Sequence, residues 1–360
     1  MRPMAFPAPA LVGIADTNAL ATRACNAASR AAAEGLFTGL AATGRSNTFV
    51  SAHVPAELEI HLPDVIAHYP GLALADAERV LWGEVMPGVP VVDLVVGDYL
   101  HPRVRPLLRA DPELPRRMRG DPDDAGTAAL AEFLAPSVII SADSVFTRFG
   151  MANTVATTWL PCAHRLLEAA GFEATVTETA HLLEFAGRVS AGLLSGAVSA
   201  TRRYPVPAAA LVIGTAFLAW RSGYFSRERR RAIGHELRQA ARDGLAKIDG
   251  AFSAYDQAKG ALLVIESYGP PTVDQLAARH LARVGRPLML AELTAGLIGE
   301  GYQVTQAEVQ EAVGRHPAFT GSPRSWISMG RSARAPLGIP VIPAPRTSTR
   351  QGPRGRASFR

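Results

Sequence analysis

Four acidic residues recur, within about 130 residues of sequence, at the ends of predicted strands and the starts of predicted helices. Asp16 and Asp143 each end a short apolar strand, whereas Glu57 and Asp124 lie in the first turns of helices. In an open parallel sheet the carboxyl ends of the strands face one crevice, so we expect the four side chains to meet there. Carboxylates that close together repel one another strongly unless a cation neutralises them.

The chemistry that such a site favours is hydrolysis of a phosphodiester bond with a divalent cation. Carboxylate oxygens without cysteine or clustered histidine favour Mg²⁺ or Mn²⁺ over Zn²⁺. The cation activates a water molecule, orients the phosphate and offsets the negative charge of the transition state. His61 and His68 lie seven residues apart on one predicted helix, but the sequence supplies no third zinc ligand at a fitting distance.

Each acid taken alone also has an ordinary structural explanation. Asp16 could cap the helix that follows it, and Glu57 could be a solvated first-turn residue. Asp124, next to Asp123, could cap its own helix, and Asp143 could be a turn residue at a strand end. The functional interpretation therefore depends on the ordered set of four and not on any single residue.

The elements that must position these acids alternate between strands and helices. Short apolar runs predict strands, and stretches with helical spacing predict the helices between them. The pattern is typical of an α/β fold in which crossover helices flank a parallel sheet. The predicted strands cover 11–15, 48–52, 89–96 and 137–143, and the predicted helices cover 19–42, 55–68, 74–84 and a segment that starts at Asp123 and Asp124.

The four acids lie in four sequence blocks, which are VGIADTNAL, VPAELEIHL, DPDDAGTAALAEFLAP and SVIISADSVFTRFG. The blocks and their order resemble a PIN domain, the fold of single-strand-specific, metal-dependent ribonucleases. Each block is weakly specific alone, so the resemblance rests on the set. It covers residues 11–149, about 140 of the 360 residues, and places a PIN-like nuclease domain over 11–150.

The resemblance implies roles for the acids, position by position. Asp16, Asp124 and Asp143 would be direct or water-mediated metal ligands, and Glu57 would hold a metal or position the attacking water. The implied reaction is hydrolysis of single-stranded RNA by an endoribonuclease. The polar residues that would support these acids are Asn18, Ser141 and Asp123.

Nucleases of this kind often act as toxins of toxin–antitoxin pairs, so the resemblance also implies an antitoxin protein as a partner. A hypothesis from a different class is a catalytically silent PIN-like scaffold that binds RNA or a protein partner. The complete set of four acids disfavours the scaffold, because degenerate PIN scaffolds usually lose one of them.

The segment 97–122 is longer and richer in arginine than in minimal PIN toxins. Two interpretations stand at this point: the arginines contact RNA phosphates, or they belong to a solvated loop. The arginines concerned are Arg103, Arg105, Arg109, Arg116, Arg117 and Arg119.

The range 151–268 is predicted to be a helical connector with an apolar segment at 206–220. That segment is shorter than the ~20 residues that span a bilayer, which favours a buried helix. Attachment to a membrane, with the arginine cluster 227–231 against anionic lipid, is the alternative. The N-terminal residues 1–10 are predicted to be loose and lack the pattern of a secretory signal, so a cytoplasmic protein is expected.

The range 269–330 is predicted to hold three helices and a hairpin, and it resembles a winged helix-turn-helix module. Such modules bind DNA or act as protein adaptors, and both partners stand as interpretations. Thr305 and Glu308 have the spacing of a capping box at the start of the third helix. Trp326 is predicted to anchor the hairpin in the core.

Charge and cysteine content set further limits. The net charge of +5 arises in 331–360, which holds seven arginines and no acidic residue, so a disordered basic tail is predicted there. With 48% hydrophobic residues the remainder can bury a sizeable core, which excludes a mostly disordered protein. Two cysteines, Cys25 and Cys162, exclude a disulfide framework and are predicted to be buried thiols.

Overall fold

The structure is a computed structural model, and it describes residues 11–30, 36–109, 113, 120–153, 159–171, 246, 247, 249–322 and 325–333. The predictions for 1–10, 206–220 and nearly all of 331–360 fall outside these ranges. Among the described residues, no helix combines the length and the apolar character that crossing a bilayer requires.

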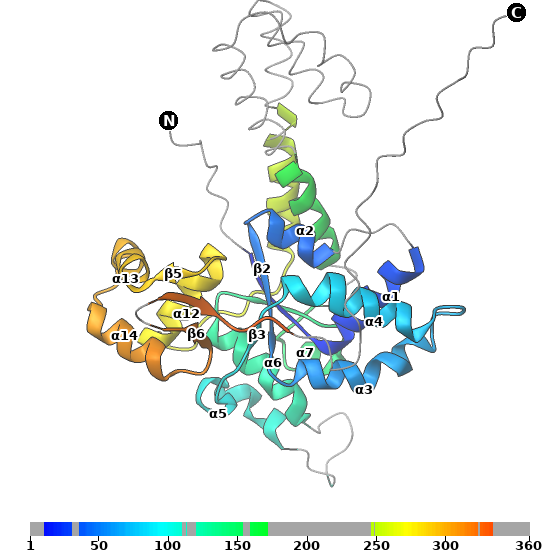
Figure 1. The fold of residues 1–360 in the computed structure, drawn as a ribbon, viewed down its shortest axis with the longest axis horizontal. Coiled ribbons are helices and arrows are strands. Elements are labelled where there is room, and N and C mark those ends of the chain that lie inside the picture. The colour runs from blue at the N-terminus through cyan, green and yellow to red at the C-terminus, as the bar shows by residue number, and fades with distance from the viewer. Residues whose placement is uncertain are drawn as a thin grey trace, which may run out of the picture.

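A four-stranded, all-parallel sheet forms the centre of the chain (Figure 1), which confirms the predicted α/β class. Its strand order is β3-β2-β1-β4, so the first strand lies inside the sheet. In register, Gly13 of β1 pairs with Thr48 of β2 on one side and with Val138 of β4 on the other. The strands are β1 (Leu11–Ala15), β2 (Ser46–Ser51), β3 (Val91–Val92) and β4 (Val138–Ile140).

The third strand and the first helix differ from their predicted bounds. The strand predicted over 89–96 is only two residues long, because the chain leaves the sheet after Val92 and starts α5 (Val96–Tyr99). The helix predicted over 19–42 is described as α1 (Thr17–Arg30) and α2 (Leu36–Ala42).

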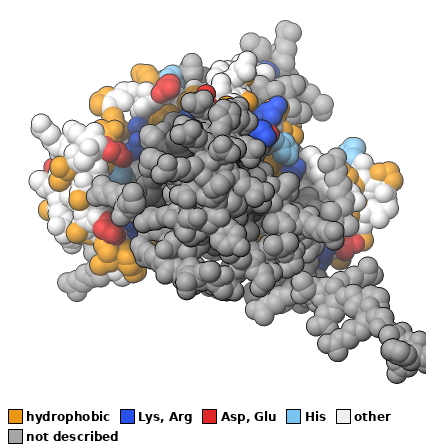
Figure 2. All heavy atoms as spheres, turned by 90° about the horizontal axis from the view of Figure 1, so that it is seen from above, with side chains coloured by type: hydrophobic (Ala, Val, Ile, Leu, Met, Phe, Trp, Pro, Cys, Tyr) orange, Lys and Arg blue, Asp and Glu red, His pale blue; other side chains and the backbone are white. Residues whose placement is uncertain are grey.

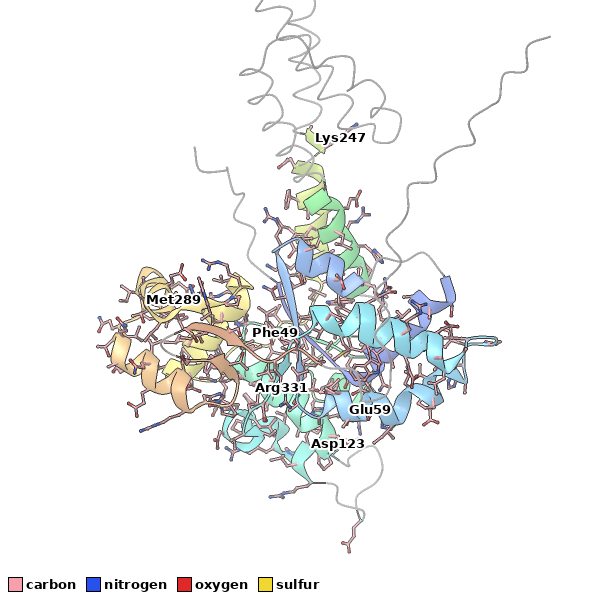
Figure 3. All side chains as sticks on the ribbon, viewed as in Figure 1. Phe49, Glu59, Asp123, Lys247, Met289 and Arg331 are labelled. Carbon is pink, nitrogen blue, oxygen red and sulfur yellow. The ribbon has the colours of Figure 1, made fainter. Side chains whose placement is uncertain are left out.

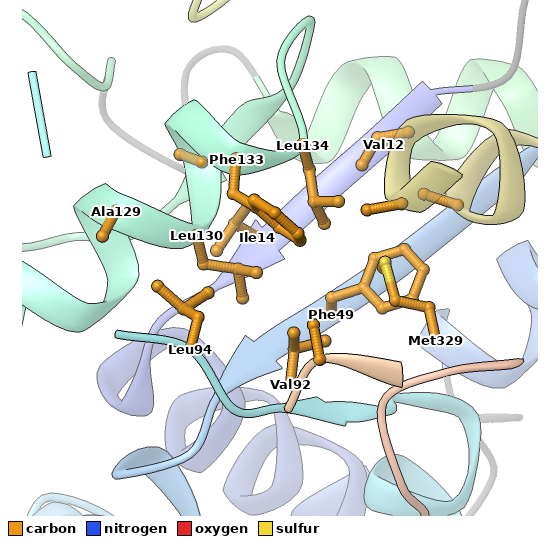
Figure 4. Close-up of a cluster of buried hydrophobic side chains, with 14 of the residues drawn as sticks. Val12, Ile14, Phe49, Val92, Leu94, Ala129, Leu130, Phe133, Leu134 and Met329 are labelled. Atoms are coloured by element: carbon orange, nitrogen blue, oxygen red, sulfur yellow. The ribbon is translucent and has the colours of Figure 1, made fainter. Parts of the chain in front are cut away.

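Alternate side chains of the strands enter two hydrophobic clusters, as the two-residue period of a strand requires. Val12, Ile14 and Phe49 join one cluster, whereas Ala15 and Val50 join the other. The first cluster (Figure 4) includes α6 (Pro122–Phe133), and the second includes α1 to α4, with α3 at Val54–Ile66 and α4 at Leu74–Val80. Leu81–Val85 continues α4 as a π-helical turn.

The C-terminal range forms three helices and a three-stranded antiparallel sheet of order β5-β7-β6. The predicted hairpin is confirmed, and so is the capping box, in which the Thr305 hydroxyl accepts from Glu308 N–H at 3.3 Å. The short strand β5 was not predicted. The elements are α12 (Val273–Val284), β5 (Leu288–Met289), α13 (Leu290–Gly299), α14 (Gln306–Arg315), β6 (Phe319–Gly321) and β7 (Trp326–Met329).

Trp326 does not anchor the hairpin in the core, and that prediction is wrong. Its side chain is 55% exposed, while Ile327 and Met329 are buried. Because neighbouring residues of a strand point to opposite faces, the inward positions of β7 belong to Ile327 and Met329.

The C-terminal elements pack directly against the parallel sheet and α6 (Figure 1). The Arg279 guanidinium, buried in α12, donates to the carbonyl oxygens of Glu132 and Phe133, both at 3.1 Å. Asn47 of β2 donates its amide to Ala282 O at 2.7 Å. One continuous hydrophobic cluster therefore joins the sheet, α6 and α12 to α14.

Both cysteines are buried, as predicted. Burial raises the pKa of the Cys162 thiol to about 11 and also raises the pKa of Cys25. Both side chains therefore stay protonated and unreactive near neutral pH.

Candidate functional site

Asp16 directly follows β1 and is held from two sides. Its backbone N–H donates to Ile140 O at 3.0 Å, which extends the ladder between β1 and β4 by one residue. The Ser141 hydroxyl donates to Asp16 Oδ2 at 2.7 Å. The side chain is only 4% exposed, so its orientation is fixed inside the protein.

Glu57 lies in the first turn of α3 and is held by groups from two other positions. The Thr17 hydroxyl, at the start of α1, donates to Glu57 Oε2. His53 Nε2 lies 3.9 Å from the same oxygen, and His53 Nδ1 lies 3.1 Å from the Ser51 hydroxyl. Glu57 is therefore oriented by neighbours and is not a freely solvated residue.

Asp124 is buried in the first turn of α6, but it does not cap the helix. The capping residue is Asp121, whose Oδ1 accepts from Asp123 N–H at 3.1 Å, and Pro122 occupies the first helical position. The capping explanation considered for Asp124 and Asp123 is thus wrong. Asp123 is exposed and lies at the outer end of the helix (Figure 3).

Asp143 combines a structural task with its place near the other acids. It caps the short helix α7 (Ser144–Arg148), because its Oδ1 accepts from Val145 N–H at 2.7 Å. Its own N–H donates to the Ser141 hydroxyl at 2.9 Å. The Ser141 hydroxyl therefore bridges Asp143 and Asp16.

The four predicted acids lie near enough to influence one another electrostatically. Burial raises the pKa of Asp124 to about 8, and the charges of Asp16, Asp143, Asp121 and Glu57 add to the rise. Burial also raises the pKa of Asp16, against the lowering effect of the Ser141 hydrogen bond, and Glu57 and Asp143 raise it further.

The four acids offer only carboxylate oxygens, the donor type that a hard divalent cation prefers, but their side chains are not spaced as ligands of one ion. Within the described ranges, no group of three or more His, Cys, Asp or Glu side chains stands close enough to hold a metal ion. Burial, and after it the neighbouring carboxylates, raise the pKa of Asp124, and a bound cation would favour the charged form against both effects.

Sequence reasoning missed the polar groups around Glu57, namely Thr17 and His53, and the Ser51 hydroxyl that contacts His53. A β-carbon added to Gly126 would lie 2.6 Å from His53 Nδ1 and 2.7 Å from the Ser51 hydroxyl. Gly126 therefore lets α6 approach the end of β2 closely. The available signals were Thr17 beside Asp16 and a serine at the end of the second strand.

Asn18, predicted to support the acids, is exposed and lines a cavity between α1 and α3. Of the predicted RNA-binding arginines, Arg105 and Arg109 are exposed. Figure 2 shows basic side chains interspersed with acidic and hydrophobic ones on the described surface that faces the viewer. The remaining candidates, Arg116, Arg117, Arg119 and the side chain of Arg103, lie outside the described part of the chain.

Comparison with known protein families, with curated proteins and with solved structures finds no match for this chain.

Proposed function

We propose that the chain is a divalent-metal-dependent endoribonuclease that cuts single-stranded RNA, with the four acids as its active site. The observation that carries this proposal is the set of hydrogen bonds at the acids: the Ser141 hydroxyl links Asp16 to Asp143, and the Thr17 hydroxyl holds Glu57. Burial and the nearby carboxylates also raise the pKa of Asp124 to about 8. Fixing several carboxylates in a buried site is costly, and cation binding offsets that cost. The order of the elements and the four sequence blocks are compatible with a PIN-like fold.

In this proposal Asp16, Asp124 and Asp143 hold Mg²⁺ or Mn²⁺, and Glu57 holds a metal or positions the water. A bound divalent cation supplies an activated water and offsets charge on the phosphate. The protein's own contribution is orientation, because Ser141 fixes Asp16 and the Thr17 hydroxyl fixes Glu57. These hydrogen bonds keep two carboxylates turned into the site before substrate arrives.

We further propose that the C-terminal elements form a winged-helix-like module that binds protein rather than DNA. The solvent-exposed face of α14 carries Glu308 at its capping box and Glu311, which pairs with Arg315 at 2.5 Å. Acidic groups on that helix oppose close contact with phosphates. An antitoxin protein is a partner of suitable class if the nuclease is a toxin.

A second function, a silent PIN-like scaffold that binds RNA or a protein, is favoured by one observation. The described acids are not already spaced as metal ligands. Calorimetric titration of the full-length protein with Mn²⁺ separates the two functions. The nuclease proposal predicts saturable binding that Asp16→Asn and Asp124→Asn each weaken at least tenfold, whereas Asp123→Asn, on the exposed neighbour, binds as the wild type does. Absence of binding by the wild type would favour the scaffold.

A further inference from the structure

A cavity of about 340 Å³ lies between α1 and α3, two helices that pack against each other. Its size falls within the range of small-ligand pockets. Its polar lining comes from one side of each helix and from the turn after α3. The polar or aromatic residues of this lining are Asn18, Thr22, His61, Asp64, His68 and Tyr69.

The cavity begins beside the acids. Asn18 lies two residues after Asp16, and His61 lies one helical turn after Glu57. Four residues of α-helix rise about 6 Å, so the His61 backbone lies about 6 Å along α3 from that of Glu57. Because the Thr17 hydroxyl bonds Glu57, the starts of α1 and α3 are tied together at that end. A polymer held at the acids would have its neighbouring unit next to this cavity.

The lining suits a nucleobase better than a phosphate. Its described residues include no Lys or Arg, and a carboxylate, Asp64, is among them. Two imidazoles and a phenol offer flat surfaces on which an unstacked base can lie. The His68 Nδ1–H donates to Asp64 O at 3.1 Å, which leaves Nε2 of the neutral ring as an acceptor for a base amino group or a ribose hydroxyl.

We propose that this cavity binds the base of the nucleotide next to the phosphate that is cut, in single-stranded RNA. The inference rests on the proposed nuclease function. His61, His68 and Tyr69 stack on the base, and Asn18 and Thr22 hydrogen-bond to its edge. A base can enter only after leaving its stack, so the cavity gives the site a preference for single strands over duplexes.

The test uses uncut RNA bound to full-length Asp143→Asn protein. The probe is a 5′-fluorescein single-stranded RNA of mixed sequence, irradiated at short wavelength, and the crosslinked peptides are mapped by mass spectrometry. We expect a nucleotide adduct within residues 61–69. Adding both His61→Ala and His68→Ala to the Asp143→Asn protein should weaken its RNA binding about tenfold or more, as lost base stacking does. His164→Ala, an exposed histidine on another helix, is the matched control and should bind unchanged.

The outcomes separate the pocket from the nuclease. Adducts only outside residues 61–69, together with unchanged RNA affinity of the histidine variants, would overturn the proposed base pocket. If the wild type still cleaves RNA in that case, the nuclease proposal is unaffected. An adduct within residues 61–69 without any RNA cleavage by the wild type would support the base pocket and overturn the nuclease proposal. Failure of single-stranded RNA to bind would overturn the pocket directly.

Discussion

Ser141 at the end of β4 donates a 2.7 Å hydrogen bond to Asp16 at the end of β1. The two residues are 125 positions apart in the sequence, yet the hydroxyl fixes the orientation of a buried carboxylate. The same hydroxyl accepts from the Asp143 N–H at 2.9 Å, so one side chain links two of the four acids.

Ser141→Ala should therefore destabilise the protein and reduce its activity. Removing the donor leaves a buried carboxylate oxygen without its partner, which costs about 1–3 kcal/mol of unfolding free energy. Urea denaturation measures that loss. Ser144→Ala, at the exposed first position of α7, is the control. Equal stability of Ser141→Ala and wild type would show that the hydrogen bond contributes nothing.

Asp124→Asn should flatten the pH dependence of stability. The folded-state pKa of Asp124 is raised to about 8, above its unfolded value, so its protonation stabilises the folded protein at low pH. That contribution is lost as pH rises from about 4 through 8. Without divalent cations, the unfolding free energy of the wild type should fall across this window relative to the variant. Parallel curves for the two proteins would contradict the raised pKa, and Asp123→Asn should behave as wild type.

His316 should change the unfolding free energy with pH in the direction opposite to Asp124. It stacks on Phe133, with ring centroids 4.9 Å apart, and its Nε2 lies 2.8 Å from the Tyr99 hydroxyl, which donates to Asp274 at 2.6 Å. Burial lowers the His316 pKa, while Asp274, Asp98 and Asp93 oppose that effect. The contribution of His316 to the unfolding free energy is present above about pH 6.5 and is lost as pH falls below that value.

Comparison of wild type with His316→Gln isolates this contribution from that of Asp124, because the acid is common to both proteins. The stability difference between the two should shrink as the pH falls from 7 to 5. His164→Gln, on an exposed histidine, should leave the curve unchanged. A stability difference between wild type and His316→Gln that stays constant with pH would contradict the lowered pKa of His316.

Gly126→Ala should destabilise the protein because its β-carbon would meet His53 and Ser51 at 2.6 and 2.7 Å. Overpacking of this kind typically costs about 1–3 kcal/mol, and moving α6 also displaces Asp124. Gly314→Ala in α14 is a matched control, since nothing lies within 4 Å of its added β-carbon. Higher helix propensity should stabilise that control by up to about 1 kcal/mol. Equal thermal unfolding shifts for the two variants would contradict the close approach.

The sequence predicted where the four acids lie in the fold, because each follows a strand or lies in the first turn of a helix around the parallel sheet. Their role as a catalytic site stays a prediction. It could not predict the partners that orient them, because Thr17 and Glu57 are 40 positions apart and meet only after folding. The capping residue of α6 is Asp121, because it directly precedes Pro122 at the first helical position. Asp124 therefore lies inside the first turn, on the buried face of the helix.

The C-terminal range shows a second limit. Capping residues Thr305 and Glu308 act locally, so their role could be predicted from spacing. The exposure of Trp326 depends on which face of β7 meets the core, and hydrophobicity alone does not determine that face. The packing of Arg279 against the carbonyls at the end of α6 depends on a contact across 146 positions, for which no local pattern exists.

Cleavage of a labelled single-stranded RNA by the full-length protein tests the central claim most directly. With Mn²⁺ the wild type should cut the RNA, chelation should stop the reaction, and Asp16→Asn and Asp143→Asn should each lower the single-turnover rate at least a hundredfold while circular dichroism stays native. Asp123→Asn should cut at the wild-type rate. Cleavage by either acid variant at the wild-type rate, or cleavage that persists under chelation, would contradict the four-acid site.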